Sequence, residues 1–193
     1  MKKLLALAPL VLTGAAMADV LVVPVNYNHP ATPGTGNVSV NFALPAVASI
    51  DSITVDLAHT WGADIDLSVS GTNGSSFVLL NNNTMSGGSG NWDAGLVAGN
   101  STLGNVAPYE FQQTGTAFSS LTQAMILGGE SDIQAQSWTA GPLAAATYTV
   151  TYDDQVGGDG GSVGNVTIVY TVPAPGAMAL LGLAGLTSRR RRA

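Results

Sequence analysis

The side chains in this sequence that are best suited to chemistry are aspartates, and three of them fall in a glycine-rich segment near the C-terminus. Asp153, Asp154 and Asp159 lie within seven residues, in the sequence DDQVGGDGG, and a second pair, Asp64 and Asp66, alternates with apolar residues in mid-chain. Calcium takes about six to eight oxygen ligands, which proteins supply as carboxylates and as backbone carbonyls of turns. These five aspartates therefore form a candidate calcium site. The alternative is that they are solvated turn residues, because aspartate hydrogen-bonds to its own backbone in turns.

The distribution of charge restricts what these carboxylates can pair with. All six basic residues lie at the two ends of the chain: Lys2, Lys3, Arg189, Arg190, Arg191 and Arg192. Residues 4–188 contain twelve acidic residues and neither lysine nor arginine. Nucleic-acid binding requires basic side chains that neutralise phosphates, so that class of function is excluded. The sequence also has no cysteine, which excludes disulfides, thiol nucleophiles and thiolate metal sites.

The sequence contains few candidates for a catalytic role. His59 lies on the apolar face of a predicted strand, where a hydrogen-bonded core histidine is expected and a catalytic or ligand role is the alternative; His29 is expected to be exposed. Glu110 and Glu130 are the only glutamates and could form a glycosidase pair, but the residues around them do not indicate a sugar cleft. Neither GxSxG nor HExxH occurs. The sequence therefore predicts that the protein is not an enzyme.

The three tryptophans are candidates for binding a sugar. Trp61 and Trp92 could stack on a saccharide from an exposed position, and Trp138 is a further candidate. The alternative is that they fill the core of the domain, because large aromatic side chains contribute much of the buried area of a fold.

Strands must position these side chains, and their signature is clearest in residues 53–80. Apolar residues recur there at every second position in two runs: Ile53, Val55, Leu57, and then Ile65, Leu67, Val69. Such alternation is typical of half-buried antiparallel strands, and Asn73-Gly74 provides a tight turn after the second run. Residues 81–136 are rich in Gly, Asn and Ser, and 121–127 fit either a helical turn or an edge strand. We predict an all-β fold, an antiparallel β-sandwich or jelly roll.

Two separated segments resemble the P (Homo B) domain, a jelly roll that accompanies subtilisin-like proprotein convertases. The first is His59-Thr60-Trp61 with Asp64-Ile65 and the alternation that follows, and the second comprises residues 147–154, the Gly-Asp loop and residues 166–168. The resemblance covers residues 38–171. It implies a non-catalytic β-sandwich, and some modules of this kind bind calcium in such loops.

The N-terminal 18 residues have the features of a secretory signal peptide. Lys2 and Lys3 precede an apolar run at 4–12, and the small residues of Ala16-Met17-Ala18 favour cleavage by signal peptidase between Ala18 and Asp19. Residues 19–37 contain a possible edge strand at 20–23 followed by several prolines and glycines. We expect this part to form an irregular arm.

Residues 172–193 combine three features in a fixed order. Pro173-Ala174-Pro175-Gly176 is followed by an apolar run at 177–186, which we expect to form a short helix, and then by Arg189, Arg190, Arg191 and Arg192. This order resembles the PEP-CTERM sorting signal of Gram-negative bacteria, which an exosortase recognises and processes. The resemblance implies a transient anchor in the inner membrane. The alternative is a plain C-terminal membrane anchor.

Together these features predict an exported protein of the bacterial envelope or extracellular space. Its β-sandwich is expected to have a structural or binding role, with no cofactor other than calcium. One alternative is a carbohydrate-binding module of extracellular polysaccharide. Another is an accessory P domain that acts with a separate subtilisin-like serine protease.

Overall fold

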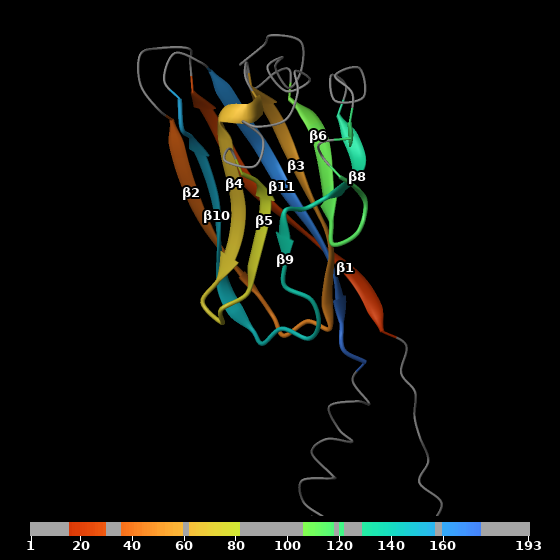
Figure 1. Cartoon of the computed structure of the whole chain (residues 1–193). Helices are drawn as coiled ribbons and strands as arrows, with labels where there is room; N and C mark the ends of the chain where they lie inside the picture. Colours follow the sequence, from red (N-terminus) through yellow and green to blue (C-terminus); the bar gives the residue numbers. More distant parts are fainter. Residues whose placement is uncertain are drawn as a thin grey trace, which may run out of the picture.

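The computed structural model describes residues 16–29, 36–59, 62–81, 106–117, 120–121, 129–156 and 160–174. Over these residues the chain is an all-β sandwich of two sheets (Figure 1), which confirms the predicted fold class. The described part contains no α-helix, and its 3-10 turn η1 is at Gly62–Asp64.

The first sheet has six strands in the order β1-β11-β3-β6-β8-β7. Their bounds are β1 Met17–His29, β3 Ser49–His59, β6 Ala107–Gln112, β7 Thr116–Ala117, β8 Glu130–Gln134 and β11 Gly161–Val172. The second sheet has five strands in the order β2-β10-β4-β5-β9. These are β2 Asn37–Leu44, β4 Ile65–Gly71, β5 Ser76–Leu80, β9 Ser137–Trp138 and β10 Ala146–Asp154.

The hydrophobic core lies between the sheets and follows the predicted alternation. Ile53, Val55 and Leu57 of β3 are fully buried, as are Ile65, Leu67 and Val69 of β4. The turn after β4 is as expected, because Gly74 has a φ of 86° and the Asn73 side chain accepts a hydrogen bond from the Ser75 N–H at 3.1 Å. The wholly antiparallel pairing we expected is wrong at one edge, where β8 runs parallel to β6 and β7. The 17 residues between β6 and β8 are long enough for such a crossover.

The structure confirms the possible edge strand at 20–23 but corrects the irregular arm that we expected in the rest of 19–37. Residues Met17–His29 form β1, which pairs with β11 along most of its length. Pro24 does not end the strand because β1 is at the sheet edge. Proline lacks only the backbone N–H, and an edge strand tolerates the loss of this donor. Instead the register shifts between Pro24 and Tyr27, where Asn26 has a φ of 50°. The sandwich therefore extends N-terminal to residue 38.

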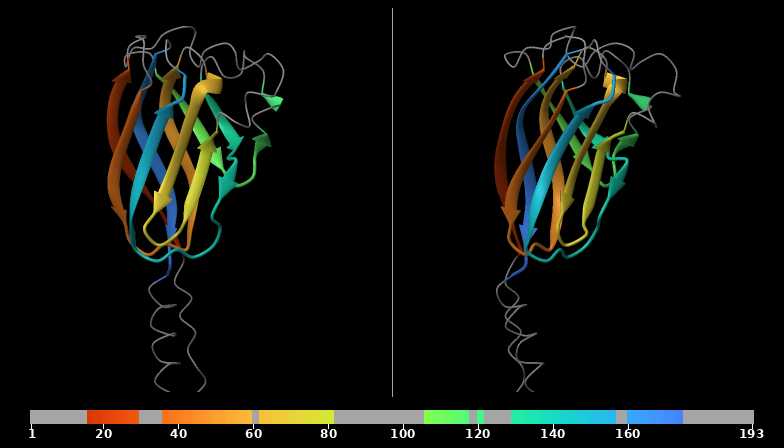
Figure 2. Two further views of the ribbon diagram at one scale, coloured as in Figure 1. Left: turned by 60° about the vertical axis from the view of Figure 1, so that its left-hand side comes forward. Right: turned by 90° about the vertical axis from the view of Figure 1, so that its left-hand side faces the viewer.

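The sandwich has two distinct poles (Figure 2). At one, which we call the base pole, Met17 at the start of β1 is the register partner of Val172 at the end of β11. At the other, which we call the loop pole, β1 ends at His29, β3 at His59 and β10 at Asp154. The chain thus enters and leaves the described fold side by side at the base pole.

None of the helical structure in the described residues is long and apolar enough to cross a membrane. Residues 1–15 of the predicted signal peptide and residues 175–193 of the predicted sorting segment lie outside the described residues.

Candidate functional site

Three strands bring two histidines and an aspartate together at the loop pole. His29 and His59 are both register partners of Gly161, so β11 lies between them in the first sheet. Asp154 comes from β10 in the second sheet. It points inward because it continues the alternation of the buried Tyr148, Val150 and Tyr152. The cluster therefore spans the two sheets.

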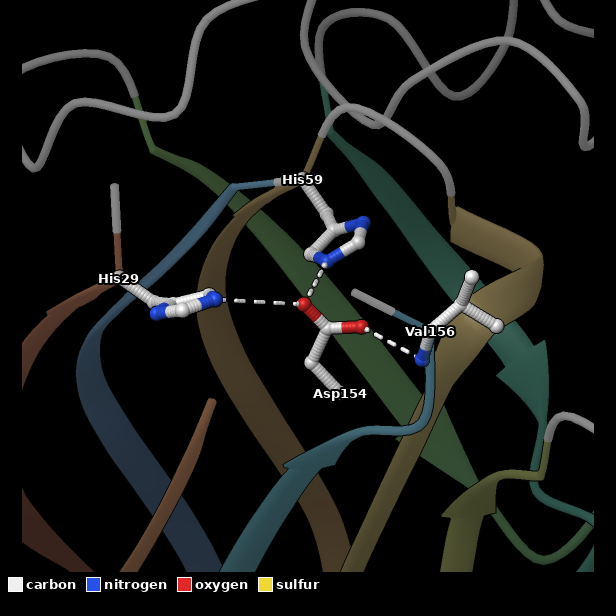
Figure 3. Close-up of polar contacts among 4 residues, drawn as sticks. All are labelled: His29, His59, Asp154 and Val156. Carbon is white, nitrogen blue, oxygen red and sulfur yellow. Dashed lines mark hydrogen bonds and ion pairs between the residues drawn. The ribbon is translucent and has the colours of Figure 1, made fainter. Parts of the chain in front are cut away.

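The Asp154 carboxylate lies between the two imidazole rings (Figure 3). Its Oδ2 atom is 3.4 Å from Nε2 of His59 and 3.7 Å from Nε2 of His29, and its Oδ1 atom accepts a hydrogen bond from the Val156 N–H at 3.2 Å. Asp154 and His59 are fully buried and His29 is 8% exposed. Because residues 4–188 contain no lysine or arginine, the histidines are the side chains that can balance this buried charge. The expected buried histidine at 59 is confirmed, whereas the expected exposure of His29 is wrong.

Two tyrosines line the cluster on its apolar side. Tyr27 is stacked on His29 with ring centroids 6.5 Å apart, and Tyr152 is tilted against both Tyr27 and His59, at 5.9 and 6.4 Å. The Tyr152 hydroxyl is buried and has no hydrogen-bond partner among the described residues. Burial raises the pKa of Tyr152, and the charge of Asp154 raises it further. The arrangement is almost closed to solvent, and through Asp154 it links β1 and β3 to the opposite sheet.

The sequence carried a signal for part of this cluster. Alternation in residues 148–154 places Asp154 on the inward face, and the lack of Lys and Arg leaves histidine as its partner. His29 was missed because the proline-rich segment that contains it was expected to be irregular.

The structure divides the predicted calcium ligands. Asp154 is buried, and its two carboxylate oxygens face the histidines and the Val156 N–H. It is therefore separated from the other candidate calcium ligands. Asp66 and Asp153 are register partners on β4 and β10, are half-buried, and lie on the outer side of the second sheet. Asp64 is in η1, where its carbonyl accepts a hydrogen bond from the Gln155 N–H at 2.9 Å.

Across the described ranges, no group of three or more His, Asp or Glu side chains is placed to hold a metal ion. Asp159 lies outside those ranges. Calcium binding by the glycine-rich loop therefore stays a prediction.

The other candidate residues fall in three places. Trp61 and Trp92 lie outside the described residues. Trp138 packs edge-on against the buried Phe77, with ring centroids 4.8 Å apart, as its alternative role in the core predicts. Glu110 and Glu130 both line one open pocket of about 330 Å³ on the first sheet. The rest of its described lining is Thr54, Pro108, Gly129 and Ser131, with no aromatic side chain for a sugar to stack on.

Comparison with known proteins identifies no family. No protein-family model matches the sequence, and no curated protein matches it. Part of the crystal structure of a serine protease of Aeromonas sobria is similar in structure, with a TM-score of 0.43 and 12% identity. That similarity covers 82% of this chain and 27% of the protease chain, so this chain spans about a quarter of that protein's length.

Two viral structures are also similar. The structure of the Gx strain of infectious bursal disease virus has a TM-score of 0.27 and 14% identity, over 98% of this chain and 55% of that one. The VP2 subviral particle of the same virus has a TM-score of 0.26 and 16% identity, over 90% and 50%. Likenesses of this size do not assign the chain to a family or give it a function.

The raised pKa of Tyr152 predicts alkaline instability. In the unfolded chain tyrosine ionises near pH 10, whereas the folded state keeps the proton to higher pH. Above pH 10 the folded state therefore binds more protons than the unfolded state. The contribution of Tyr152 to the free energy of unfolding is fully present below pH 10 and is lost as the pH rises above it. The slope from one such group approaches about 1.4 kcal/mol per pH unit. Urea unfolding between pH 9 and 11 should show a smaller slope for Tyr152→Phe than for the unmodified protein.

Tyr170→Phe is the matched control. The Tyr170 hydroxyl donates a hydrogen bond to Asp19 Oδ2 at 3.2 Å near the start of β1, and burial and this bond raise its pKa. Tyr170 is remote from the cluster, and its smaller shift should contribute less to the slope. Equal slopes for the unmodified protein and Tyr152→Phe would contradict the assignment of alkaline instability to Tyr152.

Proposed function

We propose that this chain is an exported protein of the bacterial envelope, with a non-catalytic, P-domain-like β-sandwich and a C-terminal PEP-CTERM-type sorting segment. The observation that carries the proposal is where the two processing segments meet the fold. β11 ends at Val172, which is also the first residue of the predicted sorting segment at 172–193, and Pro173 follows it. The predicted leader ends at Ala18, the second residue of β1, at the same pole. The two processing segments thus meet the sandwich at its outer ends and overlap only the first two residues of β1 and the last residue of β11.

A structural or binding role is supported by the chemistry of the sandwich. Its two histidines are buried against Asp154 and not open to a substrate. The acidic body without lysine or arginine suits a protein that stays soluble through like-charge repulsion outside the cell. In this proposal the four C-terminal arginines hold the tail on the cytoplasmic side while the body is exported.

Intact-mass measurement of protein recovered from the surface of the producing bacterium tests the proposal. We expect the main species to begin at Asp19 and to end near residue 175, because signal peptidase and an exosortase remove the two ends. Such a species contains no lysine or arginine, so trypsin should leave it intact even in urea.

The control is a variant with the four C-terminal arginines replaced by glutamine, which should accumulate with its tail attached. A main surface species of the unmodified protein that still carries Arg189, Arg190, Arg191 and Arg192 would contradict sorting and leave a plain membrane anchor.

A further inference from the structure

The predicted leader-cleavage bond lies inside a strand of the folded domain. In β1, Ala18 is the register partner of Thr171, and Asp19 is the partner of Tyr170. The side chain of Asp19 also holds it in place. Its Oδ2 atom accepts a hydrogen bond from the Tyr170 hydroxyl at 3.2 Å, and its Oδ1 atom accepts one from the Val20 N–H at 2.9 Å. The residues on both sides of the bond therefore pair with β11.

This pairing opposes cleavage. A peptidase binds several residues around the scissile bond as a single extended chain, and its cleft cannot accept β1 with β11 still attached. The rate at which a folded protein is cleaved then depends on the fraction of molecules in which the segment has opened locally. Opening here would separate Ala18, Asp19 and Val20 from β11 and break the bond between Asp19 and Tyr170.

The order of the strands removes this obstacle during synthesis. β11 is the last strand of the sandwich, and its first residue, Gly161, follows the bond by more than 140 residues. Until β11 is exported, no partner is present on the side of β1 that it occupies in the fold. The bond is then as accessible as any in an unfolded chain.

We propose that folding of the sandwich makes the peptide bond between Ala18 and Asp19 inaccessible to signal peptidase. The peptidase must therefore cleave this bond before β11 pairs with β1. The inference rests on the proposed function, which assigns the leader. N-terminal processing then precedes completion of the sandwich, whereas the bond between Pro173 and Ala174 lies outside the last strand and does not depend on this order. A chain that folds with its leader attached keeps Ala18 and Asp19 paired with β11 and retains the leader.

Cleavage by purified signal peptidase in detergent, followed by intact mass, tests the order. The full chain, allowed to fold, should be cleaved between Ala18 and Asp19 at least about tenfold more slowly than a chain that ends at Gly160 and so lacks β11. Val172→Pro, which removes a backbone donor from the residue opposite Met17, should speed cleavage of the full chain. Val172→Ala, which keeps that donor, should not.

The outcomes separate the inference from the proposed function. Equal rates for the full chain and the chain ending at Gly160, with cleavage at Ala18 in both, would overturn the inference and leave the leader assignment intact. No cleavage at Ala18 in either chain would overturn both. Hydrogen exchange of the folded full chain gives a second measurement: those amides of residues 18–23 that face β11 should be protected, and their rapid exchange would contradict an inaccessible cleavage site.

Discussion

Replacing Asp154 by alanine is expected to lower the free energy of unfolding by about 3–5 kcal/mol, the usual cost of removing one partner from a buried charge pair. The substitution removes the carboxylate that His29 and His59 both face and leaves a cavity where the two sheets meet. For a domain of this size the melting temperature should fall by roughly 6–20 °C. Thermal and urea unfolding at neutral pH measure the change.

Asp153→Ala is the matched control on the same strand. Asp153 is half-buried, faces outward and accepts a hydrogen bond from the Gln155 side chain at 2.7 Å, so its loss should cost no more than about 0.5–1 kcal/mol. Asp154→Asn, which keeps the volume and removes the charge, should lie between the two. A similar loss for Asp153→Ala and Asp154→Ala would show that the buried cluster contributes nothing specific.

The strands that carry this cluster differ in how far the sequence predicts them. β3 and β4 alternate between buried and half-buried positions over most of their length, so the sequence pattern indicates both their type and their inward faces. β10 behaves in the same way, and its alternation continues to the buried Asp154. These strands are predictable because one face packs on the core and the other faces solvent, which imposes a period of two on the sequence.

Residues 20–23 of β1 were predicted as a possible edge strand, but its continuation to His29 was mispredicted as an irregular arm. Proline and asparagine within a run argue against a central strand, but an edge strand tolerates both where its donors face away from the sheet. Pro24 and Asn26 sit at the register shift of β1, and the strand resumes at Tyr27. What holds this last part is tertiary: Tyr27 packs against Tyr152, and His29 faces Asp154, which is 125 residues away. A contact of that kind leaves no local pattern.

The same limit applies to the assembly of the site. The sequence pointed to aspartates near Gly157 and Gly158 as one group, because they are close along the chain. In the sandwich, adjacent residues of a strand face opposite sides, so Asp153 is on the outer face and Asp154 is in the core. Asp153 and Asp154 therefore lie on opposite faces of the sheet because they are adjacent in one strand. The partners of Asp154 are on β1 and β3, which are far from it in the sequence.

Gly161 is the position where a single methyl group should disturb the cluster most. It lies between His29 and His59 in the first sheet. A Cβ atom added there would contact the Tyr152 hydroxyl and the His59 ring, both of which are fully buried and have no solvent to move into. Adding atoms to a well-packed core costs about 1–3 kcal/mol, and displacing the cluster places Gly161→Ala at the upper end of that range. Urea unfolding measures the loss.

Gly164→Ala, three residues along the same strand, separates this effect from a general cost of alanine in β11. Its Cβ would meet Asp56 Cβ at 3.0 Å, a tight contact that a backbone shift of a few tenths of an ångström relieves, whereas the atoms met at Gly161 lie closer. Loss of glycine also reduces the entropy of the unfolded chain, which favours folding by about 0.4–1 kcal/mol at both positions. Gly164→Ala should therefore stay within about 1 kcal/mol of the unmodified protein, and Gly161→Ala combined with Tyr152→Phe should recover part of its loss because the hydroxyl is gone. If both alanine variants unfold alike, or if removing the Tyr152 hydroxyl recovers nothing, the cluster is not what makes glycine necessary at 161.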